Sequence, residues 1–362
     1  MILTIIVFIL ILGILIFVHE FGHYISAKKS GVRVEEFGFG FPPRIFAFKK
    51  GETTYSLNLI PVGGFVKIFG EERGEKKSTS KRAFYNKPAW QRAIILFAGV
   101  FMNLLVAAIF LSIVHGIGVP SFVEKGQEAN YRNIQIQIVE VAKNSPAEKA
   151  GIKIGDAIFG LSFNQEAVQI KEVEDVQNFI AGHIGEELNF TLKRGNETLQ
   201  KVMIPRSNPP EGEGATGIAM SKTGLISYPW YKAIIKGFET AGKLIVTMIS
   251  LFYLLIKTLI LKGTMIGEIA GPVGIAALTS QMVQLGWVYV LQFTAILSIN
   301  LAIINFLPFP ALDGGRLLFL LIEKIKGKPI KFKTERLANS IGFAFLILLI
   351  IVITFRDIVK LF

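Results

Sequence analysis

The chain opens with a long apolar stretch that runs directly into a cluster of polar residues. Residues 2–18 contain only Thr4 and Gly13 outside the aliphatic and aromatic types, and the sequence HEFGH follows at 19–23. A run of this length and polarity is typical of a membrane helix, in which backbone polar groups bond within the segment. The rest of the chain must therefore fold around a helix that carries two histidines and a glutamate into or beside the bilayer.

The HEFGH motif has the spacing of a zinc-binding helix. His19 and His23 are four positions apart and share one helical face, so both imidazoles can bind one ion while Glu20 acts on a bound water. The chain has only four histidines, which makes chance a poor explanation. The alternative is a pair of hydrogen-bonded core histidines, but in hydrocarbon this cluster costs several kcal/mol unless something neutralises it. We predict two zinc ligands and, in Glu20, a general base.

The composition indicates an integral membrane protein. The 362 residues are 51% hydrophobic, the mean hydropathy is +0.51, and the apolar residues form blocks of spanning length. The formal net charge is +12, but the cations lie in loops beside those blocks, as membrane orientation and anionic headgroups require. We expect lipid contact and no nucleic acid partner. Because the chain has no cysteine, histidine and carboxylate must hold any metal.

The distribution of Lys and Arg predicts the orientation of the first two helices. Residues 24–92 hold many more cations than acids, so the positive-inside rule places them in the cytoplasm. The first block lacks a basic start and a small-residue cleavage site, and we expect it to stay as a helix with an outer amino terminus. Residues 93–114, with Asn103 as their one amide, form the second predicted span.

The cytoplasmic region contains two strand-like runs. Phe37–Phe41 and Tyr55–Phe69 alternate apolar residues with glycine, and Gly63 and Gly64 mark a bend. We predict that these runs form membrane-associated β-hairpins. A membrane helix that unwinds as a substrate loses its backbone hydrogen-bond partners in lipid, and an edge strand of the hairpins would offer it new ones. A simple cytoplasmic lid is the alternative. Candidate substrate-binding residues here are Asn58, Gly63 and Gly64.

Residues 124–207 have the composition of a soluble domain. Their motif SPAEKAGIKIGDAI, from Ser145 to Ile158, predicts a capped short helix, a glycine turn and a strand. The motif resembles that of PDZ domains attached to bacterial proteases. The resemblance implies either binding of peptide C-termini or a rigid spacer. After two crossings, this domain lies outside.

The remaining sequence divides into a linker and a second membrane part. Residues 208–216 are rich in Pro and Gly, 228–261 are apolar but punctuated by lysines, and 288–306 and 341–355 are further predicted spans. We therefore divide the chain into a membrane protease part at 1–123, the PDZ domain at 124–207, a linker with an interfacial segment at 208–287, and a C-terminal membrane part at 288–362.

Two imidazoles leave a catalytic zinc one protein ligand short. Asp313 is the best candidate, because it follows a membrane helix in a turn broken by proline and flanked by glycine, a backbone tolerated at that depth only in a buried or wet site. The alternative is an aspartate that caps a helix before Gly314.

These motifs together resemble the site-2 protease family of intramembrane zinc metalloproteases. The resemblance rests on HEFGH, on NFLPFPALDGG from Asn305 to Gly315, on GPVGI from Gly271 to Ile275 and on the PDZ domain between them. It implies Zn²⁺ held by His19, His23 and Asp313, with Glu20 as base and Asn305 near the substrate. An amide that merely satisfies loosened backbone beside Pro308 is an equal alternative for Asn305.

The resemblance also implies a fold and a function. It implies a polytopic α-helical membrane protein of the bacterial cytoplasmic membrane, with about four transmembrane helices, the β-hairpin region and one inserted PDZ domain, where well-known members carry two. Its substrates would be single-span membrane proteins such as anti-sigma factors and remnant signal peptides, cut towards the cytoplasmic side.

Two rival functions remain open at this point. A PDZ-bearing membrane scaffold with a relict metal site would have no need of Glu20. A zinc or proton transporter would place further polar residues along facing helices, and the other apolar blocks carry almost none.

Overall fold

The computed structural model describes residues 2–71, 80–124, 126–164, 166–195, 197–263 and 270–360. The chain divides into two compact units. We call Met1–Ser112, Ile234–Gln281 and Val290–Phe362 the helical unit, and Ile113–Ala233 with Met282–Tyr289 the sheet unit.

Most of the helices belong to the helical unit. Among the described residues, five helices are long and apolar enough to cross a membrane: α1 (Ile2–Lys29), α2 (Ala89–Ile117), α5 (Trp230–Lys262), α7 (Trp287–Phe306) and α9 (Phe332–Val359). The shorter elements are α6 (Pro272–Leu285), α8 (Asp313–Lys326) and the 3-10 turn η1 (Phe84–Asn86). The four predicted spans fall in α1, α2, α7 and α9, and the segment predicted to be interfacial falls in α5.

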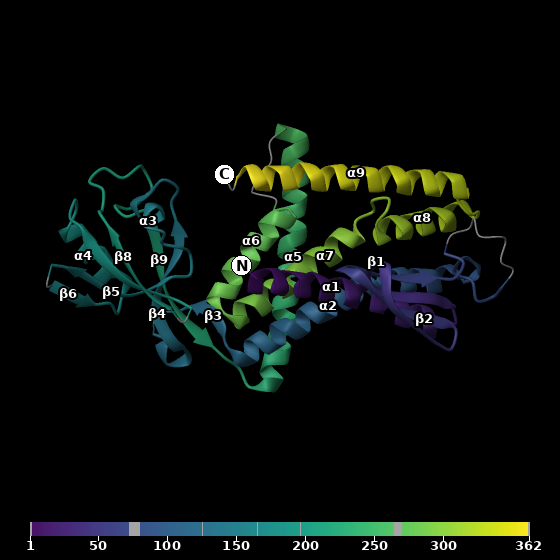
Figure 1. The fold of residues 1–362 in the computed structure, drawn as a ribbon, viewed down its shortest axis with the longest axis horizontal. Helices are drawn as coiled ribbons and strands as arrows, with labels where there is room; N and C mark the ends of the chain where they lie inside the picture. The colour runs from purple at the N-terminus through teal and green to yellow at the C-terminus, as the bar shows by residue number, and fades with distance from the viewer. Residues whose placement is uncertain are drawn as a thin grey trace. The chain divides into compact units, whose positions relative to one another are not determined.

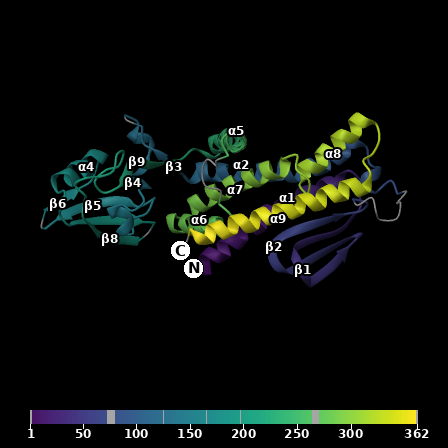
Figure 2. The same ribbon diagram turned by 90° about the horizontal axis from the view of Figure 1, so that it is seen from above.

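The long helices of this unit do not share one direction. In Figure 1, α1, α7 and α9 run roughly along the horizontal and α2 slants beside them, whereas α5 runs across all four. Figure 2 shows α5 nearly end on. A single bilayer orientation therefore cannot suit α5 and the other four helices equally.

Small residues bring α2, α5 and α7 into close contact. Ala108, Ala241 and Ala295 are buried together in one cluster, and an ideal Cβ on Gly237 would lie 2.4 Å from the backbone nitrogen of Ser112. Small side chains let helix backbones approach each other, which is how helices associate where lipid supplies no hydrophobic driving force.

The predicted β region forms a small sheet of two bent strands, β1 (Val34–Lys50) and β2 (Thr53–Ile68). Residues 34–39 pair with 64–68, residues 36–39 also pair with 54–57, and residues 44–50 pair with 53–58. The sheet packs on α1, where Phe39 contacts the position of Gly13. The stretch 64–68 is thus one edge of the sheet, and it belongs to the part that lies on α1.

The sheet unit contains a seven-stranded antiparallel sheet in the order β3-β9-β4-β5-β7-β8, with β6 paired to β5. Its elements are β3 (Val119–Phe122), η2 (Glu128–Asn130), β4 (Arg132–Val141), α3 (Pro146–Lys149), β5 (Ala157–Phe163), β6 (Glu166–Gln169), α4 (Val173–Gly182), β7 (Leu188–Arg194), β8 (Glu197–Met203) and β9 (Ile218–Ile226).

The motif at 145–158 folds as its residues predict. The Ser145 hydroxyl caps α3 by accepting a bond from the Glu148 N–H. Gly151 then takes φ 74°, a left-handed value that favours glycine. The carboxylate of Asp156 binds Arg194 through two oxygens at 2.7 and 2.8 Å. These contacts fix the turn that leads into β5.

The sheet extends beyond the predicted bounds of the soluble domain on both sides. β3 precedes residue 124, and β9 lies within the predicted linker yet pairs with both β3 and β4. Ser221, Lys222 and Thr223 interrupt its apolar residues, and a stretch rich in Pro and Gly precedes it. The strand is specified mainly by its two partners, which the local pattern does not reveal.

Candidate metal centre

Two histidines of α1 and one aspartate of α8 meet inside the helical unit. The Nε2 atoms of His19 and His23 lie 3.2 Å apart. Oδ2 of Asp313 lies 2.9 Å from Nε2 of His19 and 3.2 Å from Nε2 of His23. Both histidines are buried. The structure thus brings together three residues that are 294 positions apart at the extremes.

The three atoms have the spacing of ligands around one zinc ion. Tetrahedral zinc with bonds of about 2.0–2.1 Å separates its ligand atoms by about 3.3 Å, close to the observed triangle. Two imidazole nitrogens and a carboxylate oxygen that converge in this way need a cation or protons between them, because all three atoms can act as acceptors. The residues therefore fit a bound zinc.

The backbone after α7 aims Asp313 at the histidines. An ideal Cβ on Gly314 would lie 2.2 Å from the carbonyl oxygen of Phe306, and one on Gly315 would lie 2.2 Å from that of Phe309. Only glycine allows α8 to begin this close to the end of α7. Ala311, at φ 75°, donates its N–H to Oδ1 of Asn339 at 3.1 Å. The unusual turn is thereby held from α9.

The surroundings of Asp313 favour its ionised form. Burial raises the pKa of this carboxyl, but hydrogen bonds with His19 and His23 outweigh burial and hold the pKa below its usual range. A carboxylate in this state is suited to a cationic partner.

A cavity of 220 Å³ opens beside the triangle. Its walls include His19, Glu20, Asn305 and Asp313, together with Ile16, Leu301, Ala311 and Leu312. Glu20 and Asn305 thus face the same small space as two of the converging residues. An attacking water and a scissile peptide group are the size of reactant that such a space can admit.

The three candidate residues of the β region lie in different settings. An ideal Cβ on Gly64 would lie 3.8 Å from Cγ of Glu20, so this edge of the sheet lies beside the side chain of Glu20. Gly63 has φ 107°, and a Cβ there would lie 2.7 Å from the ring of Phe41. Asn58 is buried and donates to the carbonyl of Gly40 at 3.0 Å. Its amide braces the sheet, and it does not line the cavity.

Helix α2 contributes three residues that our sequence reasoning did not assign to the site. Nδ1 of His23 lies 2.8 Å from the carbonyl oxygen of Ile95, and Nδ1 of His19 lies 3.3 Å from Nδ2 of Asn103. Between them, an ideal Cβ on Gly99 would lie 2.4 Å from Nε2 of His23. The signal available in the sequence was a glycine and a lone amide one turn apart in an otherwise apolar span.

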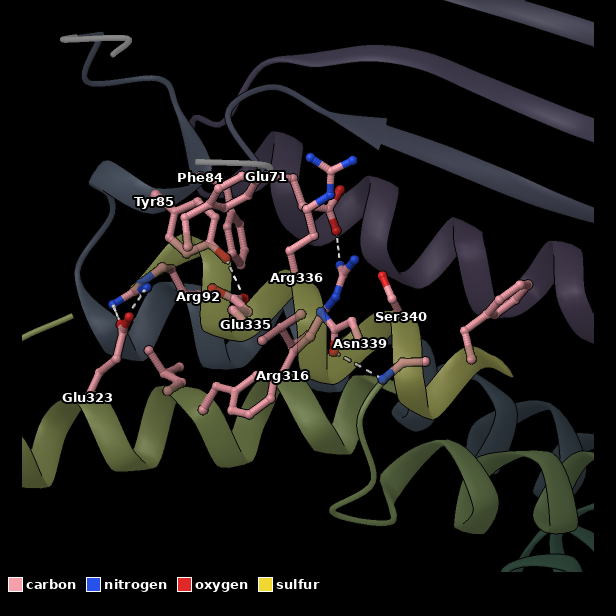
Figure 3. A pocket seen from close by; sticks show the side chains of 16 residues that line it. Glu71, Phe84, Tyr85, Arg92, Arg316, Glu323, Glu335, Arg336, Asn339 and Ser340 are labelled. Carbon is pink, nitrogen blue, oxygen red and sulfur yellow. Dashed lines mark hydrogen bonds and ion pairs between the residues drawn. The ribbon is translucent and has the colours of Figure 1, made fainter. Parts of the chain in front are cut away.

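Figure 3 shows a larger cavity, of 410 Å³, that is lined by several charged side chains. Ala311 lines both this cavity and the first one. Two ion pairs and a hydrogen bond hold the walls of the larger cavity together: Arg316 pairs with Glu71, Arg92 pairs with Glu323 at 3.1 Å, and the hydroxyl of Tyr85 donates to Glu335 at 2.7 Å. The charge of Glu71 raises the pKa of the Arg316 guanidinium. These pairs tie η1, α2 and the end of β2 to α8 and α9 around the turn that carries Asp313.

Comparisons with known proteins agree with this geometry. Residues 7–349 match the model of peptidase family M50. A protein of Clostridium acetobutylicum whose name describes a zinc metalloprotease is 35% identical over 360 residues, which is 98% of this chain and 97% of the relative. The regulator of sigma-W protease RasP of Bacillus subtilis is 32% identical over 442 aligned residues, covering 99% of each chain.

A further relative, from Nostoc, also bears the name of a zinc metalloprotease and is 31% identical over 341 residues, or 93% of this chain and 91% of the relative. The family model spans most of the chain, and all three relatives exceed 30% identity over nearly their full lengths. The chain therefore belongs to peptidase family M50 and is an intramembrane zinc metalloprotease.

Proposed function

We propose that His19, His23 and Asp313 hold the catalytic zinc and that Glu20 is the general base. The observation that carries the proposal is the triangle of ligand atoms with sides of 2.9, 3.2 and 3.2 Å, beside a cavity that Glu20 also lines. When bound, zinc supplies Lewis acidity, which makes water a nucleophile near neutral pH and polarises a carbonyl. Three protein ligands leave the fourth position open for that chemistry.

The protein's own residues then move one proton twice. Glu20 accepts a proton from the attacking water and donates it to the departing amide nitrogen, so the C–N bond breaks to give a carboxylic acid and an amine. Asn305, which also lines the cavity, is placed to orient the substrate backbone through its amide.

We propose that the edge of β2 receives the substrate as an added strand. A transmembrane helix keeps its carbonyls in i to i−4 bonds and must unwind before it can be cut. Residues 64–68 pair on one side with residues 34–39, and no described strand pairs with their other side. Gly64 borders Glu20, so a strand added there would lie beside the base, with its backbone bonded to the sheet.

We propose that the sheet unit is a PDZ domain on the outer side of the membrane. The motif at 145–158 and the short helix α4 support this assignment. β9 pairs with β3 through Thr223 to Ile226, the carbonyl of Lys222 accepts from the N–H of Val123, and Ile218 to Ser221 pair only with β4. Their other edge meets no described strand, so a peptide C-terminus could extend the sheet there.

We propose four membrane crossings, with both termini outside and the zinc towards the cytoplasm. Asp313 reaches His19 only if α1 and α7 both run inward, which leaves no room for a third full crossing between α2 and α7. The transverse direction of α5 in Figures 1 and 2 supports this topology. We infer that α5 lies in the outer interface, with Lys232 and Lys236 reaching water.

The substrates we propose are single-span membrane proteins of the bacterial cytoplasmic membrane. The name of the Bacillus subtilis relative connects that protein to regulation of a sigma factor. Anti-sigma factors with one membrane helix, and signal peptides left in the membrane, have the single unwindable segment that an edge strand can receive. A relict scaffold would not need a base beside the ligands, and a transporter would not need an edge strand there.

Membrane proteomics of cells that carry Glu20→Gln tests this function. The variant should keep zinc and accumulate uncut single-span proteins relative to the wild type. A matched Gln281→Glu variant on the exposed surface should not accumulate them. An unchanged membrane proteome in the Glu20→Gln strain would contradict the proposed protease substrates.

A further inference from the structure

The strongest unexplained polar group in the helical unit is the amide of Asn103. This residue is 0% exposed and is the one amide in the apolar core of α2. Its Nδ2 lies 3.3 Å from Nδ1 of His19, while its Oδ1 is buried and has no hydrogen-bond partner among the described residues. A buried carbonyl oxygen without a donor costs roughly 1–3 kcal/mol, so this side chain needs a reason to be there.

The contacts of His23 show which ring nitrogen of a metal-binding histidine must carry the hydrogen. Nδ1 of His23 lies 2.8 Å from the carbonyl oxygen of Ile95. A carbonyl only accepts, so Nδ1 carries the hydrogen and donates it. Nε2 of His23 is then left with its lone pair facing Asp313 and His19, which is the form of imidazole that binds a metal.

His19 requires the oxygen of the Asn103 amide, and not its nitrogen, to face Nδ1. For Nε2 of His19 to offer a lone pair to the ion, its Nδ1 must carry the hydrogen, and an NH₂ group cannot accept it. A half-turn of the amide about its Cβ–Cγ bond places Oδ1 against this N–H, so the carbonyl oxygen of Asn103 and the Nδ1–H of His19 each gain a partner. Both histidines would then donate Nδ1–H to an oxygen supplied by α2.

We propose that Asn103 is a positioning residue whose Oδ1 accepts the Nδ1–H of His19 and so fixes the tautomer and the ring plane of that ligand. The inference rests on the proposed assignment of His19 as a zinc ligand. Oxygen partners behind metal-bound imidazoles hold the ring and raise its basicity, and their loss typically weakens metal binding by about 10–100-fold.

The fold supplies what this role needs. Oγ of Ser298 on α7 donates to the backbone carbonyl of Asn103 at 2.8 Å, which holds this turn of α2 against α7. Gly99, one turn earlier, leaves room for both rings. Ile95, Gly99 and Asn103 recur every four residues, so a single face of α2 supports both histidines.

The test measures zinc affinity of the purified full chain by competition with a coloured chelator. Asn103→Leu has similar size and no acceptor, and it should weaken zinc binding by about 10–100-fold. Asn103→Asp keeps an oxygen for Nδ1–H and should bind at least as tightly as the wild type. The visible spectrum of the cobalt-loaded protein should change in Asn103→Leu and remain close to wild type in Asn103→Asp.

Two controls separate this role from general packing. Ser112→Ala, farther along α2 and away from the histidines, removes hydrogen bonds to the carbonyls of Ala108 and Ile234 and should leave zinc affinity within about threefold. If Asn103→Leu does not fold, Asn103→Ser, whose hydroxyl is too short to reach the ring, replaces it with the same expectation. Equal zinc affinity in Asn103→Leu and the wild type, or equal losses in the Leu and Asp variants, would overturn the proposal.

His19→Ala distinguishes this inference from the proposed ligand set. If His19→Ala binds zinc as tightly as the wild type, the ligand assignment itself is wrong. If His19→Ala loses zinc while Asn103→Leu retains it, the ligands stand and only the role of Asn103 is refuted.

Discussion

The sheet unit places Leu161, Phe190 and Leu192 at its centre, whereas the helical unit turns Leu10 and Phe101 outward and keeps His19 and Asn103 inside. The first arrangement is that of a domain stabilised by removing apolar side chains from water. The second gains nothing by hiding apolar side chains, because lipid is as apolar as they are. The interior of the helical unit can therefore hold polar residues that bind a metal.

This contrast changes what a buried residue means in each unit. In the sheet unit, burial reports packing, and a polar exception such as Asp156, in the turn before β5, is paired with Arg194 at the end of β7. In the helical unit, the buried polar residues His19, His23 and Asn103 contact one another. Substitutions at equally buried positions should accordingly damage stability in one unit and zinc binding in the other.

The largest expected effect comes from the polar interior of the helical unit. His19→Ala, His23→Ala or Asp313→Ala should each lose zinc and cleavage, since a site with three protein ligands has none to spare. Glu20→Gln should keep zinc and lose cleavage by at least about 10²–10⁴-fold, the usual contribution of a general base. Metal analysis and a peptide-bond cleavage assay on the purified variants measure both quantities. Full zinc occupancy in Asp313→Ala would refute its role as a ligand.

A phenylalanine-to-alanine substitution should lower stability much more in the sheet unit than in the helical unit. Phe190→Ala empties the core of the sheet unit, where Phe190 is 0% exposed, and should lower the free energy of unfolding of that unit by about 3–5 kcal/mol. Phe101→Ala, at 52% exposed on a spanning helix, should change stability by less than about 1 kcal/mol. Thermal unfolding in detergent, followed with protease digestion of the sheet unit, compares the two. Equal destabilisation would mean that the contrast between the units is false.

A glycine substitution sharpens the comparison within the helical unit. Gly99→Ala adds a Cβ 2.4 Å from Nε2 of His23 and should weaken zinc binding by about tenfold or more, while the helix itself gains from alanine. Gly242→Ala in α5 meets nothing within 4 Å among the described residues and should leave zinc affinity unchanged. Chelator competition gives the zinc affinity of each variant relative to the wild type. Wild-type affinity in Gly99→Ala would show that the rings can shift without losing the ion.

The smallest expected effect on the protein comes from single-cysteine variants, which test on which side of the membrane each labelled position lies. The chain has no cysteine of its own to react. Lys81→Cys, Asn208→Cys and Gln284→Cys occupy exposed positions and should leave activity intact. An impermeant maleimide applied to intact spheroplasts should label Asn208→Cys and Gln284→Cys and spare Lys81→Cys. Protection of Gln284→Cys alongside labelling of Asn208→Cys would mean that α5 crosses the membrane, contrary to the proposed topology.

Much of the fold followed from local patterns. The apolar blocks predicted α1, α2, α7 and α9, and the glycine-rich alternation predicted the strands of the β1–β2 sheet. β9 escaped prediction because its polar residues and its Gly-rich flank resemble a loop until β3 and β4 are placed on either side of it. α5 is ambiguous in sequence for a similar reason, since length and hydropathy do not encode the direction of a helix.

The candidate site was predictable to a different degree at each residue. The pair His19 and His23 shares one helical turn, so spacing alone placed them together. Asp313 needed the assumption that two distant motifs meet, and the structure brings them to 2.9 Å. Asn103 and Ile95 could not be assigned from sequence, because their roles depend on which face of α2 packs on α1. Asn58, a predicted substrate-binding residue, has its amide bonded within the sheet.

The pairing of β3 with β9 has a consequence for how this architecture can change over time. Val119 lies opposite Ile226 in this ladder, and the N–H of Tyr228 bonds the carbonyl of His115 at 3.0 Å, so the polypeptide enters and leaves the sheet unit at neighbouring points. An insert with adjacent ends can be lengthened, duplicated or exchanged without altering the spacing between the end of α2 and the start of α5. The inserted domain can therefore diversify while the helices that carry the metal site keep their geometry.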